Sequence, residues 1–284
     1  MTARDTTTAA VPVRVSVPVF LGSEARARSI QRRRWLLGLA VLAAVAVLWE
    51  LASRTGLAKP VLLPAPSTVA ETFADLVRTA RFWEHVVQSL VRVALGFGAA
   101  ALVAVPIGLL MGRSAVVEGG LYASLEILRP IPPIAWTPLA ILWFGLGTAP
   151  AVFLIFVGAF FPILLNTING VRGIDKRLID FARTLGATER VVLLEIIPAA
   201  ALPSILTGMR IGLGIGWMVV VAAEMIAANS GLGYMILDAR FILATDVVIV
   251  GMLTIGCLGL GMDLLFRRLE SRVLRWRREL VLER

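Results

Sequence analysis

Very few side chains in this sequence could do chemistry. The chain contains one histidine, His85, and one cysteine, Cys257, which excludes a catalytic histidine pair, an internal disulfide and a cysteine or histidine metal cluster. His85 alone is typical of a solvated or interfacial residue. No G-x-x-x-x-G-K-[ST] phosphate-binding loop occurs in the 284 residues. We therefore expect no catalytic residue, no metal site and no cofactor bound by this chain.

The remaining candidates are charged residues within long apolar segments, where a charge is costly and needs an explanation. Glu126 and Arg129 are three residues apart, a spacing that permits a local ion pair, and a solute-facing Arg129 is the open alternative. Arg210 lies deep in a later segment, and Glu224 follows 14 positions on at nearly the same helical face. Both are candidates for lining a wet cavity.

Charges near the end of an apolar segment have a simpler interpretation, because their side chains can extend to water at the membrane surface. We favour this interpretation for four residues, Glu50, Arg92, Glu224 and Asp263.

One apolar segment is interrupted by four prolines, Pro130, Pro132, Pro133 and Pro138. Proline removes a backbone donor, and non-helical backbone at membrane depth is tolerated only where it is buried in protein or faces water. Trp136, Trp143 and Phe144 lie in the same segment. We favour packing or interfacial anchoring for these aromatic residues, with a gate in a translocation path as the alternative.

The elements that must position these residues are membrane-spanning helices. The chain is 58% hydrophobic and only 17% charged, unlike a soluble domain. A helix needs about 20 apolar residues to cross a bilayer core of about 30 Å. Six segments qualify, approximately 35–53, 89–112, 119–145, 148–171, 203–228 and 246–266. The predicted fold is an all-α polytopic bundle of about six transmembrane helices.

The basic residues indicate which side each loop occupies. The net charge is +9, but the cations lie at the ends of apolar segments, which argues against a nucleic-acid-binding face. With the N-terminus inside, 20 of the 28 Lys and Arg residues fall in cytoplasmic segments, five fall outside and three fall within spans. Because basic loops stay in the cytoplasm, we predict a multi-pass membrane protein with both termini cytoplasmic.

The chain divides into four predicted regions. The first apolar segment lacks a convincing cleavage site and is interpreted as a retained anchor. After it, Thr68 and Glu71 have the spacing of a capping box at the start of an amphipathic helix, either an external docking surface or a helix lying at the interface. The regions are a disordered basic cytoplasmic arm (1–34), the anchor with the external amphipathic segment (35–88), the core domain (89–268) with a cytoplasmic loop (172–203), and a cytoplasmic tail (269–284).

The cytoplasmic loop has the pattern of two short helices. Asp175 can cap the first, and Gly186 stands where a helix ends in a left-handed conformation. Thr188 can cap the second helix, which we expect Pro198 to stop. Each helix has one apolar face. A partner in the cytosol is the natural cover for these faces.

This loop resembles the EAA loop of permease subunits of ATP-binding-cassette importers. The matching residues are Asp180, Ala182, Gly186, Ile196 and Pro203. The chain departs from the family pattern in three ways, because Asp180 replaces the usual Glu, Phe181 replaces the usual Ala, and Pro198 comes one position early.

Two further stretches narrow the resemblance. RPIPPIAWTPLAILWFGLG (129–147) and AAEMIAANSGLGYMI (222–236) are similar to permeases of the nitrate, taurine and aliphatic-sulfonate group. The resemblance implies a bacterial inner-membrane permease that carries a small anionic solute delivered by an external or periplasmic binding protein. It also implies that a separate cytoplasmic subunit uses ATP and Mg²⁺, and that the two short helices couple to a groove of that subunit.

Small residues indicate where helices approach one another closely. Gly208, Gly212 and Gly216 repeat every four residues along one face, which fits a neighbouring span or a second copy of the chain. The family favours a dimer with the path at the subunit interface, and the sequence leaves homodimer and heterodimer open. The alternative function is an ATP-independent secondary transporter or channel, which would favour inverted repeats and several buried acidic residues. Neither feature is seen.

Overall fold

The computed structural model describes residues 23–55, 59 and 61–275. Every regular element within those ranges is a helix, as the apolar segments predict. The helices are α1 (Ser23–Arg54), α2 (Pro66–Val77), α3 (Ala80–Arg113), α4 (Ala115–Leu128), the 3₁₀ turn η1 (Pro133–Trp136), α5 (Thr137–Phe144), α6 (Thr148–Arg172), α7 (Lys176–Thr184), α8 (Glu189–Val191), the π-helical turn η2 (Val192–Ile196), α9 (Ile197–Ala227), α10 (Leu232–Phe241) and α11 (Thr245–Val273).

The chain forms two compact units, Met1–Ala52 and Ser53–Arg284. In the first unit, the predicted anchor 35–53 falls within α1, whose side chains at Leu37, Val41 and Val45 are exposed, as a lipid-facing helix requires. Residues 23–34 belong to α1, so this part of the predicted disordered arm is helical instead. Residues 1–22 lie outside the described residues.

Within the described part of the second unit, four helices are long and apolar enough to span a membrane. They are α3, α6, the continuous run from α8 through α9 (Glu189–Ala227), and α11. They correspond to four of the six predicted segments. A fifth segment is the pair of α4 and the η1–α5 helix, which is bent by 86°. The break follows from the prolines, because Pro132 and Pro133 remove two donors where α4 would continue.

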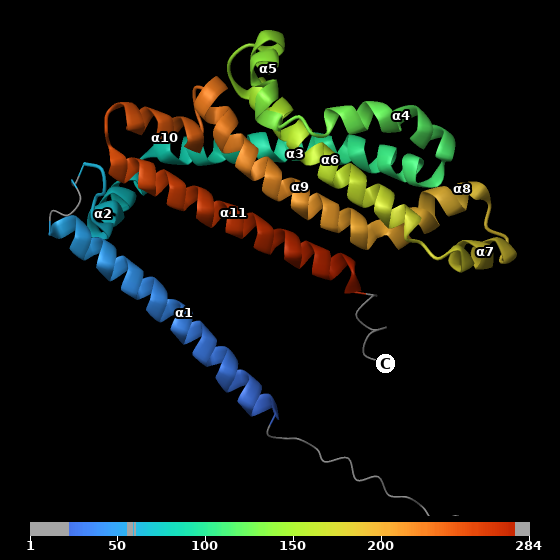
Figure 1. Cartoon of the computed structure of the whole chain (residues 1–284), viewed down its shortest axis with the longest axis horizontal. Helices are drawn as coiled ribbons and strands as arrows, with labels where there is room; N and C mark the ends of the chain where they lie inside the picture. The colour runs from blue at the N-terminus through green and yellow to red at the C-terminus, as the bar shows by residue number, and fades with distance from the viewer. Residues whose placement is uncertain (1–22, 56–58, 60, 276–284) are drawn as a thin grey trace, which may run out of the picture. The chain divides into compact units, whose positions relative to one another are not determined.

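The bent pair connects opposite ends of the second unit. Near the start of α4, Glu118 pairs with Arg172 at the end of α6. After α5, the Gly147 N–H donates to the Ala227 carbonyl at the end of α9, with an N to O distance of 2.8 Å. We refer to these two ends as the α7 end and the α10 end, and Figure 1 shows α7 and α10 at opposite ends of the helices. The pair therefore behaves as one broken span.

Helix α6 is the centre of the second unit and lies between α3 and α9 (Figure 1). Small residues make this packing possible. A Cβ atom added at Gly208 of α9 would lie 2.6 Å from Asn166 Cβ, and one added at Gly108 of α3 would lie 2.7 Å from Thr167 Cβ. Both approaches are closer than side-chain packing allows, so the glycines permit contact between the helix backbones.

Two outer helices complete the unit. α2 begins at Pro66 and its N-cap residue is Ala65, with no side-chain cap, so the capping box predicted at Thr68 is wrong and the helix starts three residues earlier. Proline at the first helical turn is favourable because its missing N–H has no partner there anyway. The Thr72 hydroxyl donates to the Asp246 carboxylate at 2.7 Å, which joins α2 to the start of α11.

Candidate functional site

The helix–glycine–helix pattern of the predicted cytoplasmic loop is present at the α7 end. The Asp175 carboxylate accepts a hydrogen bond from the Arg177 N–H at 2.9 Å and caps α7. Gly186 has φ of 91°, the left-handed region that the helix termination requires. Thr188 caps α8 by accepting from the Val191 N–H at 3.4 Å. The local turn chemistry read from the sequence is thus confirmed.

α7 presents an apolar face to its surroundings. Leu178, Phe181 and Leu185 are spaced three and four residues apart and are 45%, 64% and 73% exposed. Asp180 is exposed on the same helix and lies 3.8 Å from Arg183. A short helix with this much exposed apolar surface at one end of a bundle is typical of a binding surface.

The second helix does not stop at Pro198 as predicted. α8 continues through the π turn η2, which contains Ile196, into α9, and Pro198 occupies the first turn of α9. A proline ring normally clashes with the carbonyl four residues earlier, and a π turn widens the backbone at that place. Pro203 also lies inside α9. The loop is therefore coupled directly to a long span through one continuous helix.

Ion pairs join the loop to the ends of the spans. The Glu189 carboxylate of α8 pairs with Arg183 of α7 and, at 3.4 Å, with Arg113 at the end of α3. Arg172 at the end of α6 pairs with Glu118 of α4. The pairs of Arg113 with Glu189 and of Arg172 with Glu118 were not predictable from the sequence, because the partners lie on different helices far apart along the chain.

The broken span brings aromatic residues together. Trp136, Trp143 and Phe144 surround Phe153 of α6, with ring-centroid distances of 6.3, 5.8 and 5.6 Å. Trp143 and Phe144 are about half exposed, whereas the Trp136 indole nitrogen is buried and has no hydrogen-bond partner in the part of the chain that the structure describes. Packing accounts for the cluster, and its exposed edge stays a candidate part of the path.

Glu126 and Arg129 lie on the first half of the broken span. Their charged groups are 3.7 Å apart and both side chains are half exposed, which supports the local ion pair. At this distance and exposure the pairing is loose. Arg129 therefore stays available to a second anionic partner.

Arg210 and Glu224 do not share a cavity, contrary to the sequence hypothesis. The Arg210 Nε donates to the Asp263 carboxylate of α11 at 2.7 Å, and Asp263 also accepts from Arg267 at 2.8 Å. Both Arg210 and Asp263 are about one third exposed. Arg210 and Glu224 are 14 residues apart and lie on nearly the same face of α9. Arg210 nevertheless contacts α11, whereas Glu224 contacts α3.

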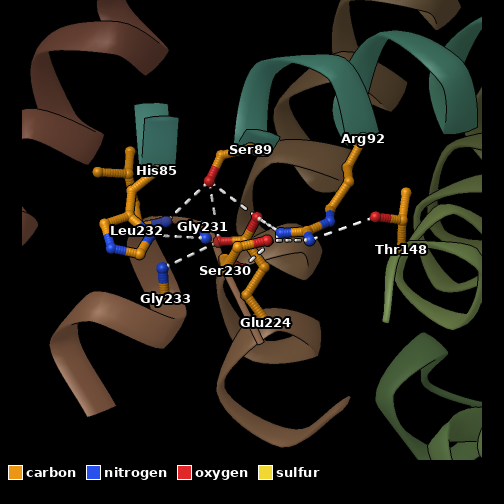
Figure 2. A network of polar contacts seen from close by, with 9 residues as sticks. All are labelled: His85, Ser89, Arg92, Thr148, Glu224, Ser230, Gly231, Leu232 and Gly233. Carbon is orange, nitrogen blue, oxygen red and sulfur yellow. Dashed lines mark hydrogen bonds and ion pairs between the residues drawn. The ribbon is translucent and has the colours of Figure 1, made fainter. Parts of the chain in front are cut away.

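Glu224 forms an ion pair with Arg92 of α3 (Figure 2). Both side chains are buried, so the prediction that they extend to water is wrong. Arg92 Nη1 donates to Glu224 Oε1 at 2.8 Å, and the Ser89 hydroxyl lies 2.8 and 2.9 Å from the two carboxylate oxygens. Opposite buried charges with hydrogen-bonded partners satisfy each other where water is absent. This pair is the most enclosed charged group among the described residues.

The spacing of three polar residues in α3 indicates this cluster in the sequence. His85, Ser89 and Arg92 are spaced four and three residues apart, so they form a polar stripe on one face of an otherwise apolar helix. A polar stripe of this kind indicates buried partners on a neighbouring helix.

The three predicted packing glycines all face α6 of the same chain. Added Cβ atoms would lie 2.9 Å from the Pro162 carbonyl oxygen at Gly208, 3.0 Å from the Ala159 carbonyl oxygen at Gly212, and 3.1 Å from an Ile155 methyl group at Gly216. Of the two alternatives that the sequence left open, the structure supports the neighbouring span.

Comparisons with known proteins agree with this architecture. Residues 104–275 match the family described as binding-protein-dependent transport system inner membrane component. The putative ABC transporter permease protein MJ0413 of Methanocaldococcus jannaschii is 43% identical over 254 residues, which cover 88% of this chain and 95% of that protein. The taurine transport system permease protein TauC of Escherichia coli is 38% identical over 252 residues, covering 87% of this chain and 92% of that protein.

A nitrate import permease and a solved transporter are also similar. The nitrate import permease protein NrtB of Synechocystis is 34% identical over 220 residues, covering 74% of this chain and 80% of that protein. An inward-facing structure of the MetNI methionine ABC transporter contains a chain with a TM-score of 0.57 and 22% identity, covering 67% of this chain and 93% of that one, which supports the fold.

The structure is a bundle of apolar helices with a broken span and a helix–glycine–helix loop. Known permeases match most of its length. The chain belongs to the binding-protein-dependent transport system inner membrane component family and is a multi-pass membrane permease of an ABC importer.

Proposed function

We propose that this permease imports a small anionic solute of the sulfonate, taurine or nitrate type, driven by a separate cytoplasmic ATPase subunit that binds α7. An external binding protein delivers the solute, and two copies of the chain enclose the path. The names of the relatives, which include sulfonate, taurine and nitrate permeases, support the solute class.

The observation that carries the proposal is the exposed apolar face of α7. Leu178, Phe181 and Leu185 keep much of their surface exposed among the described residues, while the helix that carries them is capped at both ends and joined to the spans. Burying one such side chain contributes about 1.5–3 kcal/mol. A groove on the ATPase that covers all three would bind α7 firmly and could move it.

The orientation follows from the same region. Arg113, Arg172, Lys176, Arg177 and Arg190 all belong to the α7 end, which fits a cytoplasmic face by the positive-inside rule. The α10 end is then external and faces the binding protein, and both termini are cytoplasmic.

Arg129 is the residue we propose for solute contact. The ion pairs of Arg92 and Arg210 have nitrogen to oxygen distances of 2.8 and 2.7 Å, while that of Arg129 is 3.7 Å. A half-exposed guanidinium with a loose partner on the broken span can bind a passing sulfonate or nitrate through two parallel N–H donors.

The test is uptake of labelled taurine, ethanesulfonate and nitrate by cells in which a variant replaces the native chain. A double variant, Phe181→Ser with Leu185→Ser, should abolish uptake and lose the associated ATPase activity on purification while its membrane level stays normal. The matched control is Lys176→Ala, an exposed α7 residue on the opposite side of the helix from Phe181 and Leu185, which should retain both. Normal uptake by the double variant would exclude α7 as the ATPase-binding element.

A second measurement tests the orientation. With Cys257→Ser removing the single native cysteine, Arg177→Cys should react with an impermeant maleimide only in inside-out vesicles. Reaction in intact cells would invert the assigned topology and remove the ATPase proposal with it.

A further inference from the structure

Glu224 and Ser89 accept hydrogen bonds from the start of α10, in addition to the contacts of Glu224 with Arg92. The first backbone N–H groups of α10 point at side chains from α3 and α9 (Figure 2). The donors and acceptors are Gly231 N to His85 Nδ1 at 3.0 Å, Leu232 N to Ser89 Oγ at 2.9 Å, and Gly233 N to Glu224 Oε2 at 2.9 Å. The first N–H groups of a helix have no partner within it, so these bonds complete α10. α10 cannot leave α3 and α9 without exposing three unpaired donors.

Arg92 extends the same cluster to two turns. Its Nη1 donates to the Ser230 carbonyl at 2.6 Å, and its Nη2 donates to the Ser230 hydroxyl at 2.8 Å and the Thr148 hydroxyl at 3.3 Å. Thr148 is the first residue of α6 and follows the broken span, while Ser230 precedes α10. One guanidinium thus joins α3, the entry to α6 and the α9–α10 turn.

The backbone is shaped to fit the carboxylate. Gly231 has φ of 107°, and a Cβ atom at this position would overlap the Glu224 carboxylate. A Cβ atom at Gly233 would lie 2.9 Å from Glu224 Cβ. Only glycine permits this contact at both positions.

The burial of Arg92 and Glu224 makes this cluster unsuited to binding a solute. Arg92 and Glu224 are 1% and 0% exposed, and both carboxylate oxygens are already hydrogen bonded. A solute could reach either charge only by displacing these partners. Buried ion pairs also add little net stability compared with well-packed apolar residues of similar volume. Neither a role in solute binding nor a role in stability therefore accounts for this buried ion pair and its hydrogen bonds.

We propose that Ser89, Arg92 and Glu224, here named the latch residues, are positioning residues for transport. They hold the start of α10 and the turn before α6 against α3, so that the α10 end of each subunit moves as one body when the path opens. The latch residues do not contact solute. The transport part of this proposal rests on the proposed function, whereas the structural part does not.

The structural part is tested by hydrogen exchange on the purified chain. The double variant Arg92→Met with Glu224→Leu removes both charges and keeps the volume, so the bundle should fold. It loses two or more hydrogen bonds to charged groups, which corresponds to roughly 100-fold or more in the local opening equilibrium. The amides at the start of α10 should exchange faster by that factor, with the centre of α6 unchanged. Unchanged exchange in α10 would overturn the latch.

The transport part is tested with taurine, ethanesulfonate and nitrate uptake. For the double variant we expect the maximal rate to fall about ten-fold or more with an unchanged KM and normal membrane level. The matched control removes two exposed charges near the end of α11, Arg268→Ala with Arg272→Ala, and should leave uptake unchanged. A raised KM at unchanged maximal rate would place the cluster at the solute and overturn the proposal, as would full uptake by a folded double variant.

A second variant covers the case in which the double variant does not fold. Arg92→Lys keeps the charge pair but lacks the second arm toward Ser230 and Thr148, because an ammonium group cannot reproduce the fork. Faster exchange in α10 with a lowered maximal rate supports the latch, and wild-type behaviour refutes it. If the wild-type chain imports none of the three solutes, the proposed solute class fails while the exchange result still decides the latch.

Discussion

The packing of α9 on α6 allows a sharp prediction at Gly208. In Gly208→Ala the new methyl group would lie 2.6 Å from Asn166 Cβ, 2.9 Å from the Pro162 carbonyl oxygen and 3.2 Å from Ile163 Cα. Two of these atoms belong to the backbone of α6, so no side-chain rotation can relieve the overlap. The helices must separate or shift.

The cost follows from the size of the overlap. Carbon atoms pack at about 3.5–4.0 Å, so α9 must move by nearly 1 Å from α6 at this level. Overpacking of this kind costs about 1–3 kcal/mol, partly offset by about 1 kcal/mol from the better helix propensity of Ala. Gly214 provides the control on the same helix, because it is exposed and an added Cβ would have nothing within 4 Å. Gly214→Ala should be neutral or stabilise the chain by up to about 1 kcal/mol.

The assay is thermal unfolding of the two purified variants in the same detergent. The helix-propensity gain is common to both variants, so the difference between them is the overpacking cost of about 1–3 kcal/mol, which corresponds to a melting temperature roughly 2–12 °C lower for Gly208→Ala than for Gly214→Ala. Equal melting temperatures would show that α9 and α6 do not approach at Gly208, and the assignment of the glycine face to α6 would then be wrong.

Three further outcomes are expected. Gly186→Val should lower uptake with normal membrane insertion, because φ of 91° disfavours a β-branched residue, while Gly186→Asn should retain more uptake; equal uptake by the two would remove the left-handed turn from the mechanism. Arg210→Ala should affect the uptake of anionic and neutral solutes alike, because Arg210 already pairs with Asp263; a selective loss of anion transport would return Arg210 to the path. Trp217→Phe loses the 3.0 Å bond from the indole nitrogen to the Ile255 carbonyl and should lower the melting temperature by a few degrees, with an unchanged value contradicting the α9–α11 contact.

Local features were predictable from the sequence where neighbouring residues decide them. The cap at Asp175 and the left-handed Gly186 depend on a few adjacent residues, and both were predicted correctly. The proline break after α4 was predictable for the same reason, since a missing donor acts within one turn. Pro198 failed as a stop signal because a π turn before it accommodates the ring, and no local pattern indicated that turn.

The partners of buried charges were not predictable. Glu224 lies 132 residues from Arg92, and Arg210 lies 53 residues from Asp263, so periodicity assigns each residue to a face without indicating what covers it. Arg92 and Glu224 were expected to reach water at the span ends, but the packing of α3 against α9 buries both side chains.

By itself the sequence determined an all-helical membrane protein, the positions of its core spans and the local form of the loop between α6 and α9, because hydrophobic length and turn residues act over short stretches. Tertiary structure alone decided that α6 is the central helix, that the glycine face of α9 meets α6, and that Arg92 and Glu224 join α3, α6, α9 and α10. These choices depend on which helix faces meet, and the residues in contact are far apart along the chain: 132 positions separate Arg92 from Glu224.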